Sequence, residues 1–573
     1  MAKIESLGKV IDTDVLVIGG GSAGLWTAKR AGEQGCNVLI VDKGPQDWGG
    51  LASLAGGDFD AVLPEENVDN FVKDLVYYWD GLCEQDLMEG LFKRSFERLK
   101  DYQKFGCEFL TAPDGRLKGI PQRGLDHVKL YPAKLKGKGG QDMIRGLTQE
   151  IEKLGVKRLG RTLITDLLKR DGSVVGAVGF NTLSGEFYIF KAGAVILATG
   201  AGGWKASYGQ NTSTGEGMHM AFRAGAELRN FEFAKVWVVP KLFAWESQTT
   251  LLPLGARFVN ARGRSFMDQY SPVLGANTDP HYVVISMAIE AREGRGPIYF
   301  DISRMKPEDI ELVKPQTGWQ LLNYQKLVAL GMDFFKDTME WMPQLLGSFG
   351  GLVADMEGRT RVPGLFVAGR GRSIDPGVYI GGFALFTTAV TGYLTGGVAA
   401  EYAKSREPYQ VEKDEVEVFK NHLYAPLGKA GIPPKEVLTE IQQAVFPYDV
   451  CILKNERSLK EAMRKIERLK NEVLPQMTAK DAHYLLKLIE VQAIAFLAEL
   501  YLSTSLMRKE TRAGHFREDY PDRDNEKWLC WIIAERKGDS VSFRTEPVPL
   551  ESYKIKPYRY YMDNFKFPRT YKG

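Results

Sequence analysis

Cysteine is scarce in this chain, and the cysteines that are present are scattered. Five occur among 573 residues, and no two form a Cys-x-x-Cys pair: Cys36, Cys83, Cys107, Cys451 and Cys530. This spacing excludes an iron–sulfur cluster or a zinc knuckle built by this chain alone, so we predict no metal-ligating residue. It also gives no disulfide framework, which favours a reducing, cytoplasmic setting.

An excess of charge of one sign is also lacking. The chain has 75 basic and 72 acidic residues, so we expect neither nucleic acid nor an anionic membrane as a partner. Residues 1–14 lack the apolar core of a signal peptide. Residues 376–400 carry no charge and are numerous enough to span a bilayer. Because this run is rich in glycine and lies within a strand–helix pattern, we predict a buried helix, with a membrane span as the alternative.

Short apolar runs that precede glycine turns or helix patterns predict the strands of a nucleotide-binding domain. They are residues 14–19, 37–42, 194–199 and 364–369. The first two flank a helix pattern and form a βαβ unit. The distance along the chain between these runs predicts one discontinuous domain, interrupted by an insertion.

The predicted domain boundaries follow changes in composition. We expect a dinucleotide-binding domain formed by residues 1–228 and 344–407, an inserted domain at 229–343, a helical domain at 408–545 and an arm at 546–573. Residues 458–473 and 479–509 show helical spacing with charged faces, which is typical of a helical domain.

The turn after the first strand carries the motif Gly19-x-Gly21-x-x-Gly24, and Asp42 ends the second strand. Gly19 permits the tight turn, Gly21 allows close approach of a pyrophosphate, and Gly24 lets the helix pack on the strand. The helix N-terminus offers N–H groups to phosphates, and Asp42 can accept hydrogen bonds from ribose hydroxyls. A glycine turn without a ligand is the alternative.

FAD is favoured over NAD because two later turns return to the same site, at residues 198–200 and 368–369. A nicotinamide domain needs no such returns. The predicted cofactor-binding residues are Gly19, Gly21, Ser22, Ala23, Gly24, Asp42, Lys43, Gly49, Gly50, Ala198, Thr199, Gly200 and Gly369.

Three further motifs carry a family resemblance: Asn211-Thr-Ser-Thr-Gly-Glu-Gly, Arg292-Glu-Gly-Arg-Gly and the segment 508–524 with its arginines and His515. With them the chain resembles the flavoproteins of succinate dehydrogenase, fumarate reductase and L-aspartate oxidase. The run Trp528-Leu-Cys-Trp makes it look still more like the alpha chain of adenylylsulfate (APS) reductase. The resemblance implies a Rossmann-like, discontinuous α/β FAD-binding domain, an inserted α+β capping domain over the flavin, and a C-terminal helical domain.

The cofactor is expected to be non-covalent. The membrane-bound enzymes of the family attach FAD to a histidine shortly after the ribose carboxylate, whereas the first histidine here is His127.

The same resemblance suggests catalytic residues. Arg295 lies where the family's proton-donating arginine is expected, Arg257 matches the second arginine of the relay, and Leu254 replaces the glutamate between them. An arginine near a flavin can donate a proton or bind an anion. Ordinary ion pairs are the alternative reading for both arginines.

The dicarboxylate anchors of the family are altered. Phe349 replaces a substrate-binding histidine, and Tyr379, the third candidate catalytic residue, aligns with an arginine. The asparagine and histidine of the APS reductase site correspond to Phe59 and Phe349. Because an unpaired carboxylate is costly in an apolar pocket, we expect a planar or apolar small-molecule substrate.

The sequence therefore predicts an FAD-dependent oxidoreductase subunit that performs two-electron chemistry at flavin N5 and exchanges electrons with a ferredoxin-type iron–sulfur subunit. The alternatives are an electron-transfer flavoprotein without its own substrate, the alpha chain of an APS reductase, and a fumarate reductase-like enzyme. The basic, aromatic arm at 553–573 is predicted to dock on the electron partner. A disordered tail and binding to RNA or a membrane are the alternatives for the arm.

Overall fold

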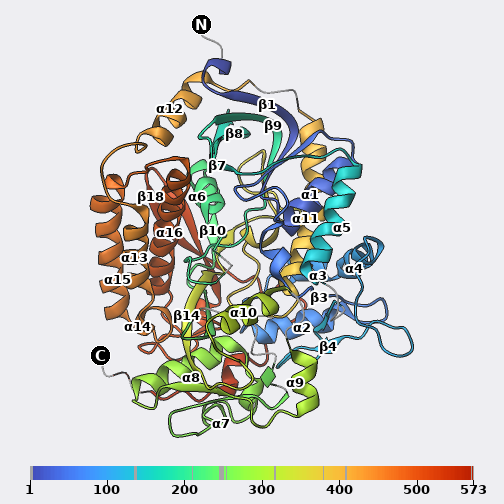
Figure 1. Cartoon of the computed structure of the whole chain (residues 1–573), viewed down its shortest axis with the longest axis vertical. Coiled ribbons are helices and arrows are strands. Elements are labelled where there is room, and N and C mark those ends of the chain that lie inside the picture. Colours follow the sequence, from blue (N-terminus) through green and yellow to red (C-terminus); the bar gives the residue numbers. More distant parts are fainter. Residues whose placement is uncertain are drawn as a thin grey trace.

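A seven-stranded sheet forms the centre of the molecule (Figure 1). The computed structural model describes residues 4–133, 138–208, 211–243, 251–252, 254–314, 318–378, 380–406, 410–569 and 571. The strand order is β6 (Lys157–Leu159), β2 (Val38–Val41), β1 (Lys9–Ile18), β9 (Phe187–Leu197), β8 (Ser173–Asn181), β7 (Thr162–Arg170), with β16 (Leu365–Val367) also paired to β9. Strands β6, β2, β1, β9 and β16 run parallel, so the carboxyl ends of β1, β2, β9 and β16 meet at one edge. All four predicted apolar runs lie in this sheet.

Three helices pack together beside the sheet: α1 (Ser22–Glu33), α5 (Gly140–Lys153) and α11 (Phe383–Lys404). Among the described residues, α11 alone is long and apolar enough to cross a membrane, yet most of it is buried inside the protein. Its glycines allow close contact with α1, since a Cβ on Gly392 or Gly396 would lie 2.6 or 2.4 Å from a backbone oxygen of that helix. Residues 383–400 of the predicted run thus lie in a mostly buried helix, as predicted, and the helix begins seven residues later than the run.

The inserted region has its own antiparallel sheet, ordered β11 (Ala234–Pro240), β14 (Glu340–Ser348), β13 (Ile298–Asp301) and β12 (Arg257–Val259). Its helices are α7 (Met267–Tyr270), α8 (Pro280–Arg292), α9 (Pro307–Val313) and α10 (Gly318–Ala329). Figure 1 shows α7 and α8 at the end of the molecule opposite the N-terminus. Strand β14 continues to Ser348, beyond residue 343. The exact domain boundaries stay a prediction.

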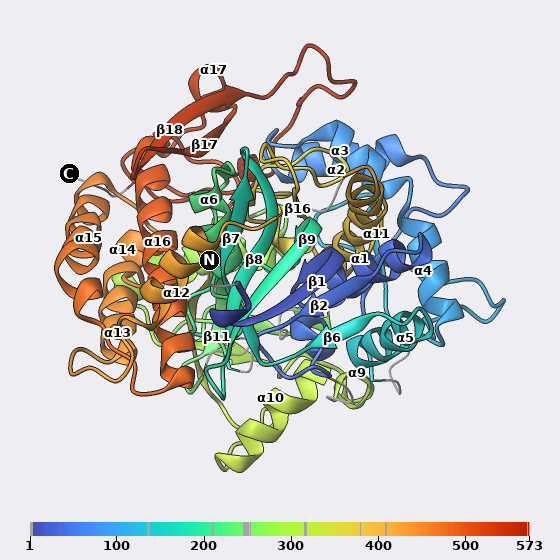
Figure 2. The ribbon, with the colours of Figure 1, turned by 90° about the horizontal axis from the view of Figure 1, so that it is seen from above.

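The C-terminal helices lie on the other side of the large sheet from α1, α5 and α11 (Figures 1 and 2). They are α12 (Lys413–Tyr424), α13 (Pro434–Val445), α14 (Tyr448–Cys451), α15 (Glu456–Arg468) and α16 (Ala482–Met507). A further sheet joins β15 (Gly351–Leu352), β10 (Leu228–Arg229), β17 (Cys530–Lys537) and β18 (Ser540–Pro547). Smaller elements complete the described fold: α2 (Val68–Tyr78), α3 (Gln85–Phe92), α4 (Ser95–Lys104), α6 (Glu216–Ala224), α17 (Asn525–Trp528) and the sheet β3 (Phe59–Asp60), β5 (Lys129–Tyr131), β4 (Ile120–Pro121).

Buried arginines connect these parts. Arg508, Arg512 and Arg517 have no solvent exposure. The Arg508 guanidinium donates to Glu232 at 2.9 Å and to Glu510 at 2.8 Å. Both oxygens of Glu510 also accept from Arg512, at 2.6 and 2.8 Å. The conspicuous 508–517 motif therefore has a structural role in the interior.

The C-terminal arm packs on the rest of the chain. The Tyr561 ring is fully buried, with its centroid 4.6 Å from that of Tyr78 and 5.1 Å from that of Tyr282. Phe565 stacks on Tyr282 of α8 with centroids 4.3 Å apart. Arg559 pairs with Asp126 at 2.9 Å. The predicted docking role is wrong for these groups, because they already contact α2, α8 and the adjoining loops.

Replacing Tyr561 with alanine should destabilise the protein. Loss of a fully buried aromatic ring costs about 3–5 kcal/mol, so the midpoint of thermal unfolding should fall clearly. Tyr558→Ala is the matched control, because Tyr558 is 62% exposed and its loss should change stability by no more than about 0.5 kcal/mol. Equal midpoints for the two variants would contradict the packing of the arm.

Candidate functional site

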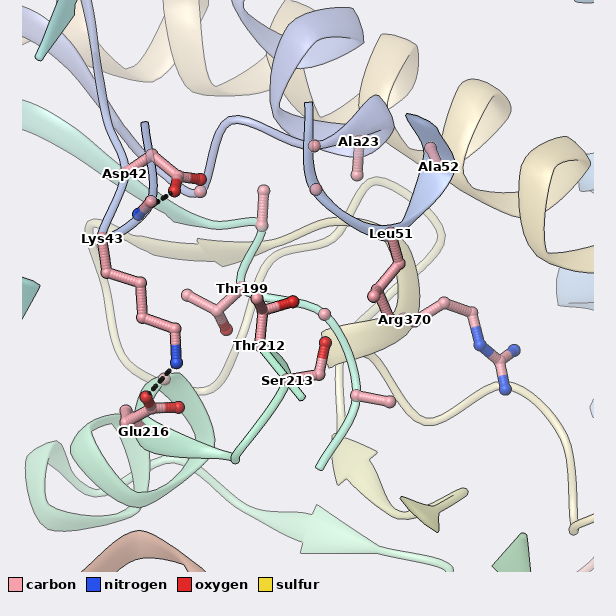
Figure 3. Close-up of a pocket in the computed structure, with 18 of the residues that line it drawn as sticks. Ala23, Asp42, Lys43, Leu51, Ala52, Thr199, Thr212, Ser213, Glu216 and Arg370 are labelled. Atoms are coloured by element: carbon pink, nitrogen blue, oxygen red, sulfur yellow. Dashed lines mark hydrogen bonds and ion pairs between the residues drawn. The ribbon is translucent and has the colours of Figure 1, made fainter. Parts of the chain in front are cut away.

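A cavity of about 610 Å³ opens where the carboxyl ends of the parallel strands meet the inserted sheet and α16. Its walls come from the β1–α1 turn, the ends of β2, β9 and β16, the N-terminus of α11, strands β11 and β14, and α16. Figure 3 shows Asp42 and Lys43 on one side of this space and Arg370 on the other.

The glycine turn forms one wall of the cavity. One of its glycines permits packing of the helix on the strand, and another borders the cavity. A Cβ on Gly24 would lie 1.9 Å from the Gly19 carbonyl oxygen, so Gly24 lets α1 pack on β1 and does not line the cavity. A Cβ on Gly21 would meet protein atoms only at 3.7 Å or more and would stand in the cavity. Gly21 is also the N-cap of α1, where no described side chain caps the helix. The N-terminal N–H groups of α1 are thus available to an anion beside Gly21.

Asp42 follows the neighbouring strand β2 and is hydrogen-bonded to the glycine turn. Its carboxylate accepts the backbone N–H of Gly20 and that of Gly44, each at 2.6 Å. The carboxylate also lines the cavity, and each oxygen keeps a further acceptor site. Asp42 is therefore placed to accept a hydroxyl of a bound nucleotide.

Lys43 connects the turn to the helical region. Its ammonium donates to Glu216 at 2.5 Å, to Glu490 of α16 at 2.8 Å and to Thr214 at 3.0 Å (Figure 3 draws the Glu216 contact). Burial opposes the charged form of Lys43, but Glu216 and Glu490 outweigh it and raise its pKa above the usual value. Lys43 lines the cavity, but its charge is already matched within the protein.

The remaining predicted cofactor residues fall into two groups. Those lining the cavity are Gly19, Ser22, Ala23, Gly50, Ala198, Thr199 and Gly200. Gly49 and Gly369 lie behind the wall, both with positive φ. A Cβ on Gly49 would lie 2.4 Å from Ile144, and one on Gly369 would lie 2.6 Å from the Ala23 side chain. These two glycines permit packing around the site.

The two predicted catalytic arginines do not line this cavity. Arg295 donates to both oxygens of Glu290, at 2.7 and 2.9 Å, and pairs with Glu293. Arg257 pairs with Asp301 at 2.8 Å. Local carboxylates hold both guanidinium groups away from the cavity lining, and a catalytic role for either arginine stays a prediction. Tyr379 lies outside the described residues.

Charged residues that the sequence analysis missed line the end of the cavity near the inserted sheet. They are Lys235 of β11, Arg370 and Asp375. The Arg370 guanidinium pairs with Asp375 at 2.5 Å and lies 5.7 Å from the centre of the Phe349 ring. This end of the cavity therefore carries charged side chains as well as Phe349. Arg370 directly follows Gly369, so a closer reading of that turn would have found it, whereas nothing local marks Lys235.

Helix α16 contributes a second unpredicted group to the walls: His483, Leu486, Lys487 and Glu490. Glu490 also pairs with Lys205 at 2.5 Å, so the carboxylate stands between two ammonium groups. Although burial opposes ionisation of Glu490, Lys43 and Lys205 lower its pKa. The Asp42 end of the cavity is thus closed by a helix more than 400 residues further along the chain.

The chain matches two family models and known proteins over most of its length. Residues 14–381 match the family model "FAD binding domain", and residues 440–561 match "Fumarate reductase flavoprotein C-term". The chain is 29% identical to one of the subunits of the fumarate reductase (CoM/CoB) of Methanothermobacter marburgensis, over 92% of this chain and 98% of that protein.

Solved structures show the same fold. The quinol fumarate reductase FrdA of E. coli superposes with a TM-score of 0.85 at 22% identity, covering 96% of this chain and 99% of that one. Adenylylsulfate reductase of Archaeoglobus fulgidus gives 0.80 at 21%, covering 96% and 98%. The predicted fold class, with FAD-binding, capping and C-terminal helical domains, is confirmed. The chain belongs to the succinate dehydrogenase and fumarate reductase flavoprotein family, and it is an FAD-dependent oxidoreductase.

Proposed function

We propose that this chain is the flavoprotein subunit of a complex in which a small-molecule substrate exchanges two electrons with an iron–sulfur subunit of ferredoxin type, by way of non-covalent FAD. The main support is the composition of one cavity. A dinucleotide turn forms one end of the cavity. The other end carries charged side chains and is bordered by the sheet of the capping domain. When bound, FAD supplies two-electron chemistry at its N5 atom.

The residues of the cavity suit FAD. The Gly21 turn and the α1 N-terminus would hold the pyrophosphate, and Asp42 the adenosine ribose. Ala198, Thr199 and Gly200 would contact the same nucleotide half from β9, while Leu51, Ala52 and the N-terminus of α11 would border the flavin half. His483 is the histidine among the described lining residues. It lies on α16 with Glu490, which holds Lys43 next to Asp42, and this placement supports non-covalent binding.

The cysteines bear on how electrons would leave the flavin. All five are free, and among the parts of the chain that the structure covers no group of three or more His, Cys, Asp or Glu is arranged to hold a metal ion. Electrons must therefore reach another protein, a quinone, oxygen or a soluble carrier. The name of the Methanothermobacter relative describes it as one part of a multi-subunit fumarate reductase, which favours another protein.

The decisive experiment is purification from the native organism, followed by identification of the co-purifying chains and their iron content. A ferredoxin-type companion is expected, and its reduced form should bleach the flavin. Oxygen consumption by the isolated chain with a substrate would instead indicate a self-sufficient oxidase. Bleaching only by the companion, with no substrate able to reoxidise or reduce the flavin, would indicate an electron-transfer subunit.

Gly21→Val should abolish flavin binding. The new side chain would enter the cavity where the pyrophosphate is placed, and a clash of only about 1.4 kcal/mol already lowers affinity tenfold. The flavin-to-protein ratio of the purified variant measures this. Gly24→Ala is the contrasting variant. Its Cβ would lie 1.9 Å from the Gly19 oxygen, so this variant should lower the yield of soluble protein in addition to the flavin content. A yellow Gly21→Val protein at full occupancy would show that the turn does not hold the cofactor.

Acid denaturation should release the flavin. The first histidine of the chain is His127, so no histidine near residues 43–52 is available for attachment. The histidine among the described lining residues of the cavity lies on α16. After precipitation with trichloroacetic acid, the yellow colour should remain in the supernatant. Colour in the washed pellet would mean a covalent link.

A further inference from the structure

We propose that Arg370 is an anion-binding residue that selects a monocarboxylate substrate with an apolar body. The inference rests on the proposed function and specifies the substrate class of the same cavity. Arg370 carries more hydrogen-bond donors than the described residues of the protein use.

Arg370 is only partly satisfied by the protein. A guanidinium has five N–H donors in a planar fork, and among the described residues its hydrogen bond is the one from Nη1 to Asp375 Oδ2, at 2.5 Å. The Arg370 side chain is 19% exposed and lines the cavity. Its remaining donors are thus unused among the described residues, on a side chain that borders the cavity. Such a fork matches the two oxygens of a carboxylate.

Asp375 holds the fork in place. This residue is 2% exposed, and its Oδ1 atom is buried with no hydrogen-bond partner among the described residues. A buried carboxylate with an unused oxygen is costly unless a charge or a polar ligand compensates it. Arg370 supplies the charge. This pairing fixes the position of the Arg370 guanidinium at the cavity wall.

The surfaces next to Arg370 are apolar. Phe349 lies against the guanidinium, and Val378, Ile380 and Phe383 line the same cavity. A second carboxylate on the far side of a substrate would meet these side chains. A molecule with one carboxylate and a planar apolar body satisfies both surfaces, because its charge meets Arg370 and its body covers the hydrophobic wall. Lys235 enters from the capping domain and adds a second cation on the cavity wall.

The experiment uses the flavin-containing protein and two probes, benzoate and succinate, with sulfate as a simple anion. Binding is followed by the change in visible flavin absorption. Wild-type protein should bind benzoate more tightly than succinate or sulfate. Arg370→Gln should weaken benzoate binding by about 10- to 100-fold, the range expected for loss of a charged hydrogen-bonded pair. Arg370→Lys should recover only part of the affinity.

Further variants keep the test valid if Arg370→Gln folds poorly. The double variant Arg370→Gln/Asp375→Asn leaves no unpaired buried charge and should show the same loss of benzoate binding. Asp375→Asn alone should tighten benzoate binding, since it removes a negative charge beside the ligand while the amide oxygen can still accept from Arg370. Arg359→Gln is the matched control, because Arg359 pairs with Asp355 and Glu357 outside the cavity.

Tighter binding of succinate or sulfate than of benzoate would overturn the inference, as would unchanged benzoate affinity in the double variant. Loss of FAD from Arg370→Gln at wild-type stability would assign Arg370 to the cofactor instead. Failure of the proposed function would look different: benzoate would still bind through Arg370, but no electron partner and no substrate turnover would be found.

Discussion

The ion pairs of the buried 508–517 segment hold the parts of this molecule in register. Arg508 reaches Glu232, which shortly precedes the capping sheet, and Arg512 donates to the backbone oxygen of Asp80, just after α2. Lys454 donates to the backbone oxygen of Glu232 at 2.7 Å, and burial lowers its pKa to about 7. Removing one partner of such a buried pair costs about 3–5 kcal/mol, because the other charge is left uncompensated. The relative placement of the cavity walls depends on this network.

With the walls fixed, the two ends of the cavity differ in how their charges are satisfied. Lys43, Lys205, Glu216 and Glu490 each have an opposite charge in the protein, and that end is preformed. Around Arg370 and Asp375 donors and an acceptor are left over among the described residues. A tightly held cofactor at the first end and an exchangeable substrate at the second is the arrangement that this difference favours.

Local sequence was sufficient where the chemistry depends on neighbouring residues. The roles of Gly19, Gly21 and Gly24 follow from one turn, and Asp42 lies at the end of the next strand. Local sequence failed where distant segments meet. Glu490 approaches Lys43 only through tertiary packing. The family motif also did not place Arg295 on the cavity wall, but there the cause is local, because Arg295 pairs with Glu290 in its own segment. In the arm, Tyr561 and Phe565 pack on Tyr78 and Tyr282, which lie far away along the chain, and local sequence did not reveal these contacts.

The path of the chain around the cavity also bears on biosynthesis. Because the walls begin at Ile18 and are completed by Glu490 of α16, a ribosome must make most of the polypeptide before the site exists. Domains usually fold as they emerge, N-terminal part first, but here the first βαβ unit emerges long before α16, the helix that closes the Asp42 end of the cavity. The cavity is therefore incomplete through most of the synthesis of the chain. A cofactor that needs all of its walls can bind only to the nearly finished protein.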